Sequence, residues 1–493
     1  RVLLEAIRAD ALIAASGGDV PAVAVARGLA LPILQLASAP SANGAMTIET
    51  DSAGAHVTPT LPSADDLALI MHTSGTTTRP KIVPITHAQL VARARLNPLV
   101  ASDRGICAAP TFTSSAVESG LLATLASGAS VMFPRDASPE RIVDHLGKLQ
   151  PTYVWASPAV HVAMLEAVTD RKSISTASLR FLRSGSSALP PILQENLEAA
   201  FGVPVMQGYG LTETGVIARN PLPPGERRPG SVGKPLGMQV RIMAPSGEFL
   251  PRGGVGEIVV QGPGVMSGYE DPEANRLAFR DGWFRTGDLG YFGDDDFLFL
   301  YGRLHDTINR GGRQVAPAEI DAAFLAHPAV LEAAAFAVPH PSLGEDIVAA
   351  VVLREPRSAN AQELREHAFA HLAAYKVPTT VVLVDSLPKN ALGKVQRSVL
   401  ADTLRESLRA GFLPPRDADE ELVAGLFAEV LGLERVGALD NFFELGGDSL
   451  SGTRVVARVN SARGVDLPIV SLFEMPTVAD FACAVRGTAR ATS

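Results

Sequence analysis

Residues 72–81 hold the densest group of side chains that could bind phosphate. The segment packs five hydroxyls, one glycine and two cations into ten residues, and it follows an apolar run. A loop of this composition can offer backbone N–H groups, hydroxyl donors and a lysine charge to phosphate oxygens. It is not a Walker A loop, because the GxxxxGK[ST] pattern is absent. On composition alone, a phosphate-binding loop and a polar surface loop stay equally open.

Two single residues could carry further chemistry. Lys394 ends a glycine-bearing loop after a predicted strand, a position where a lysine is usually just solvated. Ser449 stands in the run D-N-F-F-E-L-G-G-D-S-L, between two amphipathic helical patterns. Two ordinary interpretations of Ser449 are a helix-capping serine and an esterase nucleophile. The esterase pattern GxSxG is missed by its last residue, Ser451, and no strand precedes it.

The elements that must position these residues alternate between helix and strand through about the first 300 residues. Ser138 followed by proline is typical of a helix start. The alternation predicts a layered α/β core. Short strands between Gly and Pro residues at 221–301 predict a β-rich subdomain. The expected helices cover 2–15, 138–149 and 159–168, and the expected strands cover 67–72 (buried), 152–155, 179–183, 240–243 and 257–261.

A smaller α+β unit follows, and then an all-helical tail. Pro414 and Pro415 predict a stiff, non-helical linker between the two. Thr477 is the expected cap of a final helix. The small unit is expected to have helices at 318–327 and 361–374 and strands at 333–338, 347–353 and 380–384. In the tail, one apolar helix face is formed by Leu422, Leu426, Phe427, Val430 and Leu431.

The composition excludes several classes of protein. The chain has 493 residues, 46% hydrophobic and 19% charged, which excludes disorder as the main state. With 43 Lys+Arg against 52 Asp+Glu the net charge is −9, and no basic run offers nucleic acid a cationic face. The longest strongly apolar uncharged stretch, 119–134, falls short of the about 20 residues of a membrane-spanning helix. Cys107 and Cys483 lack CxxC spacing, so we expect a cytoplasmic protein without a disulfide framework.

Six short motifs stand in a fixed order along the chain. They are T-S-G-T-T-T-R-P-K at 73–81, G-Y-G-L-T-E at 208–213, G-E to G-Y between 256 and 269, F-R-T-G-D-L at 284–289, Y-G-R at 301–303 with a glycine pair at 311–312, and L-P-K-N-A-L-G-K at 387–394. In order and spacing they resemble the ANL superfamily of adenylate-forming enzymes, which includes acyl-CoA synthetases, adenylation domains of non-ribosomal peptide synthetases and luciferases. One such motif is weak evidence, but six in register over about 330 residues are highly specific. The amino-acid sequences of these motifs look most similar to those of small-acid CoA ligases of the oxalate-, malonate- and 4-coumarate-activating kind.

The resemblance implies that a carboxylate is joined to the α-phosphate of ATP and pyrophosphate is released. Because negative charge accumulates around phosphorus, catalysis would be mainly positioning and electrostatic stabilisation. The implied catalytic residues are Lys394, which bridges the carboxylate and the α-phosphate, Thr212, which approaches the α-phosphate, and Glu213, which holds Mg²⁺. The implied nucleotide-binding residues are Thr73, Ser74, Gly75, Thr76, Thr77 and Lys81 of the phosphate loop, Gly185, Ser186 and Ser187 of a backbone turn, Tyr209 against the adenine, Asp288 at the ribose hydroxyls, and Arg303 at the ribose or phosphate.

The resemblance also implies where the acid binds. Phe112, Thr113 and Gly208 are its expected pocket residues. Amino-acid-activating relatives place an Asp where Thr113 stands, to pair with the substrate ammonium. A buried ammonium without a partner is unfavourable, so a carboxylic acid without an α-ammonium is expected. Glu118 is the alternative partner for an ammonium.

The small unit resembles the mobile lid of the family. The lid closes for adenylation and then rotates to admit a thiol. The pivot is expected at His305, where family members usually have Asp or Lys. Gly311 and Gly312 are then expected to present a slim hairpin to the incoming pantetheine arm.

The run at 440–450 resembles the attachment site (D)xFFxxGGxS(L/I) of peptidyl and acyl carrier proteins. The resemblance implies 4′-phosphopantetheine on Ser449, added by a phosphopantetheinyl transferase. The phosphopantetheine arm is a long tether that ends in a thiol, and it raises the effective concentration of that thiol near the active site.

We therefore expect an α/β large adenylation core with a β-rich subdomain, a small α+β mobile lid and a C-terminal all-α four-helix carrier. The expected boundaries are 1–304 for the core, 305–408 for the lid, 409–417 for the linker and 418–489 for the carrier. The chain begins at Arg1 with no signal peptide and well inside the family's large domain, so the first part of that domain is expected to be missing.

The expected function is ATP- and Mg²⁺-dependent activation of a small carboxylic acid, then its transfer to the chain's own phosphopantetheine. Such a chain would be a loading or stand-alone module of natural-product (antibiotic) biosynthesis that delivers to downstream synthase domains, with no nucleic-acid or membrane partner. Two alternatives stay open: a free-standing acyl-CoA ligase with CoA as acceptor, and a non-catalytic carrier or docking module.

Overall fold

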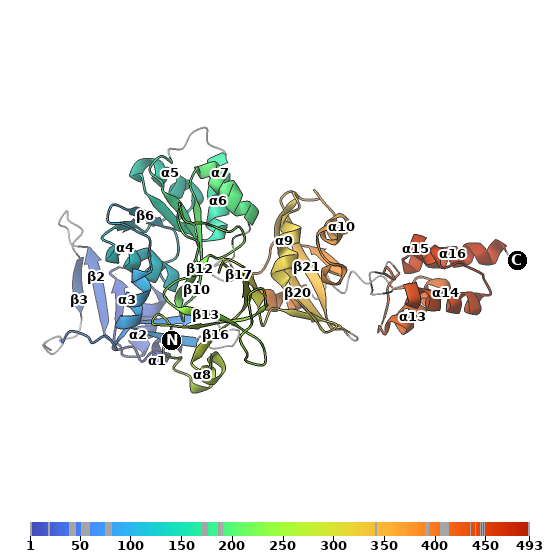
Figure 1. The fold of residues 1–493 in the computed structure, drawn as a ribbon, viewed down its shortest axis with the longest axis horizontal. Coiled ribbons are helices and arrows are strands. Elements are labelled where there is room, and N and C mark those ends of the chain that lie inside the picture. Colours follow the sequence, from blue (N-terminus) through green and yellow to red (C-terminus); the bar gives the residue numbers. More distant parts are fainter. Residues whose placement is uncertain are drawn as a thin grey trace. The chain divides into compact units, whose positions relative to one another are not determined.

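The computed structural model divides the chain into two compact units (Figure 1). The first unit comprises Arg1–Thr286 and Tyr291–Phe299, and the second comprises Gly287–Gly290 and Leu300–Ser493. The structure describes residues 2–17, 20–38, 46–50, 60–73, 81–169, 176–185, 189, 191–340, 343–389, 394–404, 414–433, 435–438, 440–443, 445, 447 and 449–491.

A seven-stranded sheet forms the centre of the first unit, in the order β12-β11-β10-β9-β8-β6-β7. Strands β7, β6, β8, β9 and β10 run parallel, and β11 and β12 are added antiparallel. Parallel strands need crossover connections, and helices fill that role here. The strands are β6 (Arg104–Cys107), β7 (Ser130–Met132), β8 (Tyr153–Ala156), β9 (Phe181–Ser184), β10 (Val205–Leu211), β11 (Gly215–Arg219) and β12 (Lys234–Pro235), and the helices between them are η1 (Ser115–Leu122, a π-helix), α4 (Ala123–Ala126), α5 (Pro139–Leu149), α6 (Pro158–Thr169) and α7 (Pro191–Phe201).

The two faces of this sheet carry different side chains, because successive residues of a strand point to opposite faces. One face packs apolar side chains against α5, α6 and α7: Ile106, Val154, Leu182 and Val205. On the other face Cys107 and Trp155 lie beneath η1. A Cβ on Gly120 of η1 would lie 2.8 Å from the Cys107 sulfur, so the helix backbone approaches the sheet closely.

The N-terminal segment corrects one expectation. Residues 2–15 do not form one helix: α1 (Val2–Ala6) stops, Arg8 adopts a left-handed φ of 51°, and β1 (Leu12–Ala15) follows. β1 pairs in parallel with β2 (Ile33–Ser38), which pairs with β3 (Met46–Thr50), and α2 (Pro21–Gly28) connects the first two. Strand pairing for the run L-I-A-A thus outweighs its helical pattern.

The strand at 67–72 is not buried as expected. β4 (Leu67–Thr73) pairs with β5 (Lys81–Thr86) in a two-stranded antiparallel sheet, and α3 (His87–Arg95) follows. Leu67 is 57% exposed. An apolar run reads the same in a buried strand and in a hairpin, so only tertiary packing distinguishes them.

A second sheet of the first unit confirms the β-rich texture expected after residue 221. Its order is β13-β14-β16-β15, with β17 paired to β16. The unit boundary runs through this pair, because Gly287–Gly290 of β16 belongs to the second unit. The elements are β13 (Gln239–Met243), β14 (Gly256–Gln261), α8 (Pro272–Ala278), β15 (Phe279–Arg280), β16 (Trp283–Phe292) and β17 (Leu298–Arg303).

The small α+β part of the second unit has a sheet in the order β19-β18-β21-β20, with β22 paired to β21. One face packs against α9 and α10, and the other packs against α11. The helix expected at 361–374 is shorter, because Leu372 is extended and a 3₁₀ turn follows at Ala374–Lys376. The elements are β18 (Ile308–Arg310), β19 (Arg313–Val315), α9 (Pro317–Leu325), β20 (Val330–His340), β21 (Gly344–Leu353), α10 (Ala361–His371), β22 (Thr380–Leu383), a 3₁₀ turn at Arg397–Val399 and α11 (Leu400–Thr403).

The C-terminal part of the described chain is helical, as expected (red in Figure 1). Phe427, Phe442 and Phe481 are fully buried at its centre. Thr477 caps the last helix, since its Oγ1 accepts a hydrogen bond from the Asp480 N–H at 3.1 Å. The helices are α13 (Ala418–Leu431), α14 (Ser449–Arg463), α15 (Val470–Glu474) and α16 (Val478–Ala491). Among the described residues, none of the helices combines the length and the apolar character that spanning a membrane requires.

Candidate active site

The predicted phosphate loop joins the strands of the β4–β5 hairpin. Its first and last residues, Thr73 and Lys81, are direct cross-strand partners. Ser74, Gly75, Thr76 and Thr77 lie outside the described residues, and so do Ser186 and Ser187 of the predicted backbone turn. Gly185, the first residue of that turn, directly follows β9. A Cβ on Gly185 would lie 2.3 Å from the Trp155 ring, so only a residue without a side chain fits there.

Glu213, the predicted magnesium ligand, is buried in the turn between β10 and β11. Tyr269 Oη donates a hydrogen bond to Glu213 Oε1 at 2.6 Å. Burial raises the pKa of Tyr269, and the charge of Glu213 raises it further, so the phenol keeps its proton and orients the carboxylate. Lys81 Nζ lies 5.0 Å from the centre of the same ring. Tyr269 thus contacts both a predicted metal ligand and a predicted phosphate ligand.

Glu213 is a donor of the kind that magnesium uses. The described residues contain no group of three or more His, Cys, Asp or Glu side chains that could hold a metal ion. Mg²⁺ is commonly bound through one or two carboxylates and completed by substrate phosphates. A single oriented carboxylate such as Glu213 meets that requirement.

Arg93 of α3 hydrogen-bonds to the backbone of Thr212 and Glu213. Its guanidinium donates to the carbonyl of Thr212 at 3.2 Å and to that of Glu213 at 3.0 Å. It also donates to the Gly264 carbonyl at 2.8 Å and pairs with Glu118 at 2.5 Å. Both charged side chains of this pair are almost completely buried. Arg93 is therefore a positioning residue for the two predicted catalytic side chains.

This geometry excludes the role considered for Glu118 as partner of a substrate ammonium. Its carboxylate is already neutralised by Arg93, inside the protein. The sequence alone does not distinguish a glutamate that faces a ligand from one that pairs with an internal arginine. The partner, which lies 25 positions earlier, is visible only in the fold.

Thr212 lies next to the predicted acid pocket. Its Oγ1 is 3.1 Å from the Ser114 hydroxyl, at the start of η1. Thr113 Oγ1 donates to the Pro110 carbonyl at 2.8 Å and accepts from the Ala116 N–H at 3.3 Å, so it helps to form the turn into η1. The hydroxyl that stands in place of the usual Asp is therefore used by the backbone of this chain.

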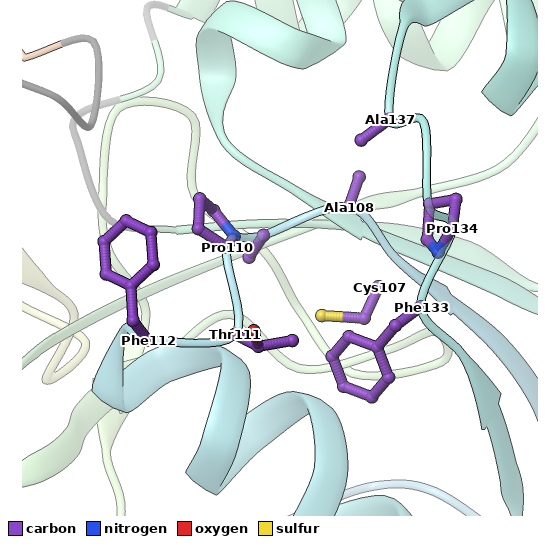
Figure 2. Close-up of a pocket in the computed structure, with 9 residues that line it drawn as sticks. Cys107, Ala108, Pro110, Thr111, Phe112, Phe133, Pro134 and Ala137 are labelled. Atoms are coloured by element: carbon purple, nitrogen blue, oxygen red, sulfur yellow. The ribbon is translucent and has the colours of Figure 1, made fainter. Parts of the chain in front are cut away.

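A cavity of about 270 Å³ opens after β6 and β7 (Figure 2). In sheets of this type, ligands bind at the carboxyl ends of the strands. Of the predicted pocket residues, Phe112 lines this cavity and is 62% exposed. Thr113 and Gly208 do not line it. The lining residues are Cys107, Ala108, Ala109, Pro110, Thr111, Phe112, Phe133, Pro134 and Ala137.

Gly208 and the following residues form the end of β10. Gly208 is the cross-strand partner of Arg219 in β11. Tyr209, the predicted adenine neighbour, is 8% exposed. A Cβ on Gly210 would lie 2.2 Å from the Gly215 carbonyl oxygen, so the close turn between the two strands requires glycine.

The second unit brings together three predicted residues that are far apart in the sequence. Arg303 Nε lies 3.1 Å from Asp288 Oδ1, and Asp288 is 7% exposed. Lys394 is exposed as a whole, but loss of solvent around its ammonium lowers its pKa, with repulsion from Arg303 as the next cause. The negative charge of Asp288 opposes this shift. A predicted ribose ligand and two predicted cations therefore share one electrostatic environment.

Arg397 anchors the chain just after Lys394. Its guanidinium pairs with the buried carboxylate of Asp321 and donates to the Ala335 carbonyl at 3.0 Å. Residues 390–393 of the lysine loop lie outside the described residues. The far end of that loop is thus fixed to the sheet of the small domain.

The predicted hinge and hairpin both lie at the start of the second unit. His305 is exposed in the turn between β17 and β18, a few residues after the boundary between Phe299 and Leu300. Gly311 and Gly312 adopt φ angles of 58° and 82° between β18 and β19. Two central residues with positive φ are the requirement of a tight hairpin turn.

Ser449 is exposed at the first position of α14. A Cβ on Gly447 would lie 2.3 Å from the Phe442 ring, so this glycine lets the preceding loop pack on the core. Phe443 stacks on Phe473 at 4.7 Å. The two phenylalanines of the F-F pair therefore hold the loop, and the serine hydroxyl stays accessible.

Sequence reasoning missed the residues that position the site. Arg93, Tyr269 as the partner of Glu213, and Arg397 carry no chemical signature of their own. Gln89 was also missed; its side chain donates to the Val265 carbonyl at 2.9 Å. The only available signal was weak: Gln89 and Arg93 are polar and four residues apart on one short helix, which places them on the same face.

Three protein families match the chain in order. Residues 1–270 match the AMP-binding enzyme family, residues 319–394 match the AMP-binding enzyme C-terminal domain, and residues 421–485 match the phosphopantetheine attachment site. The matches follow the predicted order of core, lid and carrier.

Similarity to individual proteins supports these family matches. Oxalate–CoA ligase of Arabidopsis thaliana is 39% identical over 367 residues, 73% of this chain and 71% of that protein. Sulfoacetate–CoA ligase of Cupriavidus necator is 40% identical over 377 residues, 75% of this chain and 73% of that protein. The ATP-bound crystal structure of MatB from Rhodopseudomonas palustris aligns with a TM-score of 0.72 and 29% identity, over 82% of this chain and 81% of MatB.

Proposed function

Because the chain belongs to the AMP-binding enzyme family and carries a phosphopantetheine attachment domain, we propose that it loads the acid it activates onto its own carrier. The observation that carries the proposal is Ser449, which is exposed at a helix start on the same polypeptide as the adenylating residues. A covalent tether makes the second reaction intramolecular, so the thiol needs no separate binding step.

The proposed chemistry has two steps. In the first, an oxygen of the acid carboxylate attacks the α-phosphorus of ATP, the bond to the β-phosphate breaks, and pyrophosphate leaves. In the second, the pantetheine sulfur attacks the acyl carbon, the thiol proton is lost, and AMP leaves. Lys394 and Thr212 would stabilise the first transition state, and Glu213 would hold the magnesium that neutralises the phosphates.

Residues of several motifs would hold the nucleotide. Lys81 and the hydroxyl-rich loop before it suit the phosphates, and Tyr209 suits the adenine. Asp288, an ionised acceptor beside Arg303, suits the ribose hydroxyls. The roles of these residues rest on the family motifs together with their burial and contacts.

We propose a small carboxylic acid without an α-ammonium as the substrate. The Thr113 hydroxyl hydrogen-bonds within the turn into η1, and the Glu118 carboxylate is neutralised by Arg93. Neither residue therefore supplies a negative charge for a substrate ammonium. The names of the relatives support the same class, because oxalate and sulfoacetate both lack an ammonium group.

We propose the domain boundaries 1–304, 305–408, 409–417 and 418–489, with His305 as the pivot of the lid and Gly311–Gly312 as the hairpin that meets the pantetheine arm. The wider setting is proposed to be a loading or stand-alone module of natural-product assembly, which acts with a phosphopantetheinyl transferase and downstream synthase domains. The two free cysteines, Cys107 and Cys483, support a reducing cytoplasm.

A second candidate function is a CoA ligase with an idle carrier. Its supporting observation is that several relatives bear the names of CoA ligases. In that case CoA, and not the carrier thiol, would be the acceptor. A non-catalytic docking module is the third possibility, and it predicts no pyrophosphate exchange with any acid.

Two variants separate these functions. Lys394→Ala should abolish acid-dependent ATP–pyrophosphate exchange but leave thioester transfer from supplied acyl-AMP largely intact. Ser449→Ala should keep pyrophosphate exchange and abolish covalent loading. Equal loss of both reactions in the Lys394 variant would contradict its role. Loading that persists in the Ser449 variant, or thioester formed only with added CoA, would favour the CoA ligase.

A further inference from the structure

Two arginines lie on the same face of the central sheet. Arg183 of β9 is the cross-strand partner of Met206, and Arg219 of β11 is the partner of Gly208. Met206 and Gly208 are two residues apart on β10, so they point to the same face. Trp155 of β8 is the partner of Arg183 on the other side. The two guanidinium groups and the indole therefore share the face that η1 covers.

Arg183 is buried and Arg219 is half-buried, and neither has a counter-charge among the described residues. Arg183 is 5% exposed; its guanidinium stacks 5.3 Å from the Trp155 ring and donates to the Ser119 carbonyl at 3.3 Å. The Arg219 Nη1 and Trp155 Nε1 atoms are buried, and neither has a hydrogen-bond partner in the part of the chain that the structure describes. Within the described part of the chain, no carboxylate lies within ion-pair distance of either arginine.

No other group of this region supplies the missing negative charge. Burial raises the pKa of the Cys107 thiol to about 11, and burial also raises the pKa of the Tyr153 phenol. Both groups are therefore neutral near pH 7. Burial lowers the pKa of Arg183 to about 10, and burial and the neighbouring Arg183 lower the pKa of Arg219 to about 9. Both arginines still carry their charge near pH 7.

The pair lies under the elements that carry the predicted pocket. A Cβ on Gly208 would lie 3.7 Å from Arg219 Cγ, and a Cβ on Gly185 would touch the Trp155 ring. Ser119, which accepts from Arg183, belongs to η1, and Ser114 at the start of η1 contacts Thr212. The two arginines thus contact β10 and η1, which carry predicted acid and nucleotide residues.

We propose that Arg183 and Arg219 bind a second anionic group of the acid, so that the substrate is a short acid with two acidic groups, a dicarboxylate or a sulfocarboxylate. Unpaired buried cations are unfavourable, and an anion that fills the site supplies the missing charge and accepts the unused N–H donors. Trp155 Nε1 is a third donor for the same group. The carboxylate to be adenylated would stay at the outer end, toward Thr212. This inference rests on the proposed adenylation function.

The test compares malonate with malonamate, which keeps its size but has an amide in place of one carboxylate. We expect the kcat/KM of ATP–pyrophosphate exchange to be at least about 100-fold higher for malonate, because a site built for a charged group rejects a neutral analogue strongly. Sulfoacetate should behave like malonate, and propionate like malonamate.

The variants test which residue causes the preference for malonate over malonamate. Arg219→Met should remove most of this preference, and Arg219→Lys should keep part of it. Arg252→Met, which changes an exposed arginine, is the matched control and should leave the preference unchanged.

A second readout does not depend on turnover. Malonate should raise the unfolding temperature of the wild-type protein, and Arg219→Met should abolish that shift. Exchange with malonamate or propionate at the rate of malonate would overturn this inference and leave adenylation standing. Exchange with no acid would overturn the proposed function, and the malonate-induced shift would then decide the role of the arginines.

Discussion

Two sets of arginines near η1, Arg93 on the one hand and Arg183 with the half-buried Arg219 on the other, differ in what surrounds them. Arg93 pairs with Glu118 and donates to three carbonyls of neighbouring loops. Arg183 and Arg219 have no such carboxylate among the described residues, and Arg219 Nη1 has no hydrogen-bond partner among them. A buried charge that the fold neutralises is part of the framework, whereas one that the fold leaves unneutralised marks a place for a ligand.

The largest effect that this comparison predicts is the loss of Arg93. Arg93→Met leaves Glu118 buried without a partner, which should lower the free energy of unfolding by about 3–5 kcal/mol. Denaturant unfolding followed by tryptophan fluorescence measures it, because both tryptophans, Trp155 and Trp283, lie in the first unit. The double variant Arg93→Met with Glu118→Leu should recover much of the loss. Equal destabilisation in the double variant would show that the pair is not the cause.

The second prediction has the opposite sign. Arg219→Met removes a half-buried charge that has no carboxylate partner among the described residues, so it should raise the stability of the unliganded protein, by about 1–4 kcal/mol. The same fluorescence titration compares it with the Arg93 variant. A fall in stability would mean that Arg219 has a structural partner and would remove the contrast between the two sets.

A smaller effect is expected in the pH dependence. Because folding lowers the pKa of Arg219 to about 9, its charge opposes folding at every pH below that value. The penalty should fall as the pH rises through about 9, since the folded protein then loses the proton. The stability advantage of Arg219→Met over wild type should therefore shrink between pH 8 and about pH 10. An advantage that stays constant over this range would contradict the assignment.

The smallest effect is expected at an exposed arginine. Arg252 pairs with Asp296 on the surface, and both side chains are more than half exposed. Arg252→Met should change the free energy of unfolding by less than about 1 kcal/mol, because solvent screens exposed pairs. A change as large as that of the Arg93 variant would show that burial is not what separates these arginines.

The motifs made the three-part organisation predictable, because each motif joins several residue types at fixed spacing. The helix expected at 2–15 and the burial expected at 67–72 were wrong, since strand pairing and exposure depend on neighbours from elsewhere in the chain. The order of Arg183, Met206, Gly208 and Arg219 on one face was equally hidden, because it requires the register of three strands. Pairing of Glu118 with Arg93 depends on packing between two helices that no local pattern reports.

The most direct test of the account is the intact mass of the phosphopantetheinylated chain after incubation with ATP, Mg²⁺ and an equal mixture of malonate and malonamate, without CoA. The account predicts that the malonyl mass is gained, that malonamate contributes almost none, and that Ser449→Ala gains neither. An unchanged mass that yields a thioester only after CoA is added would contradict self-loading. A gain of both acyl groups in equal amounts would contradict the assignment of the two unpaired arginines.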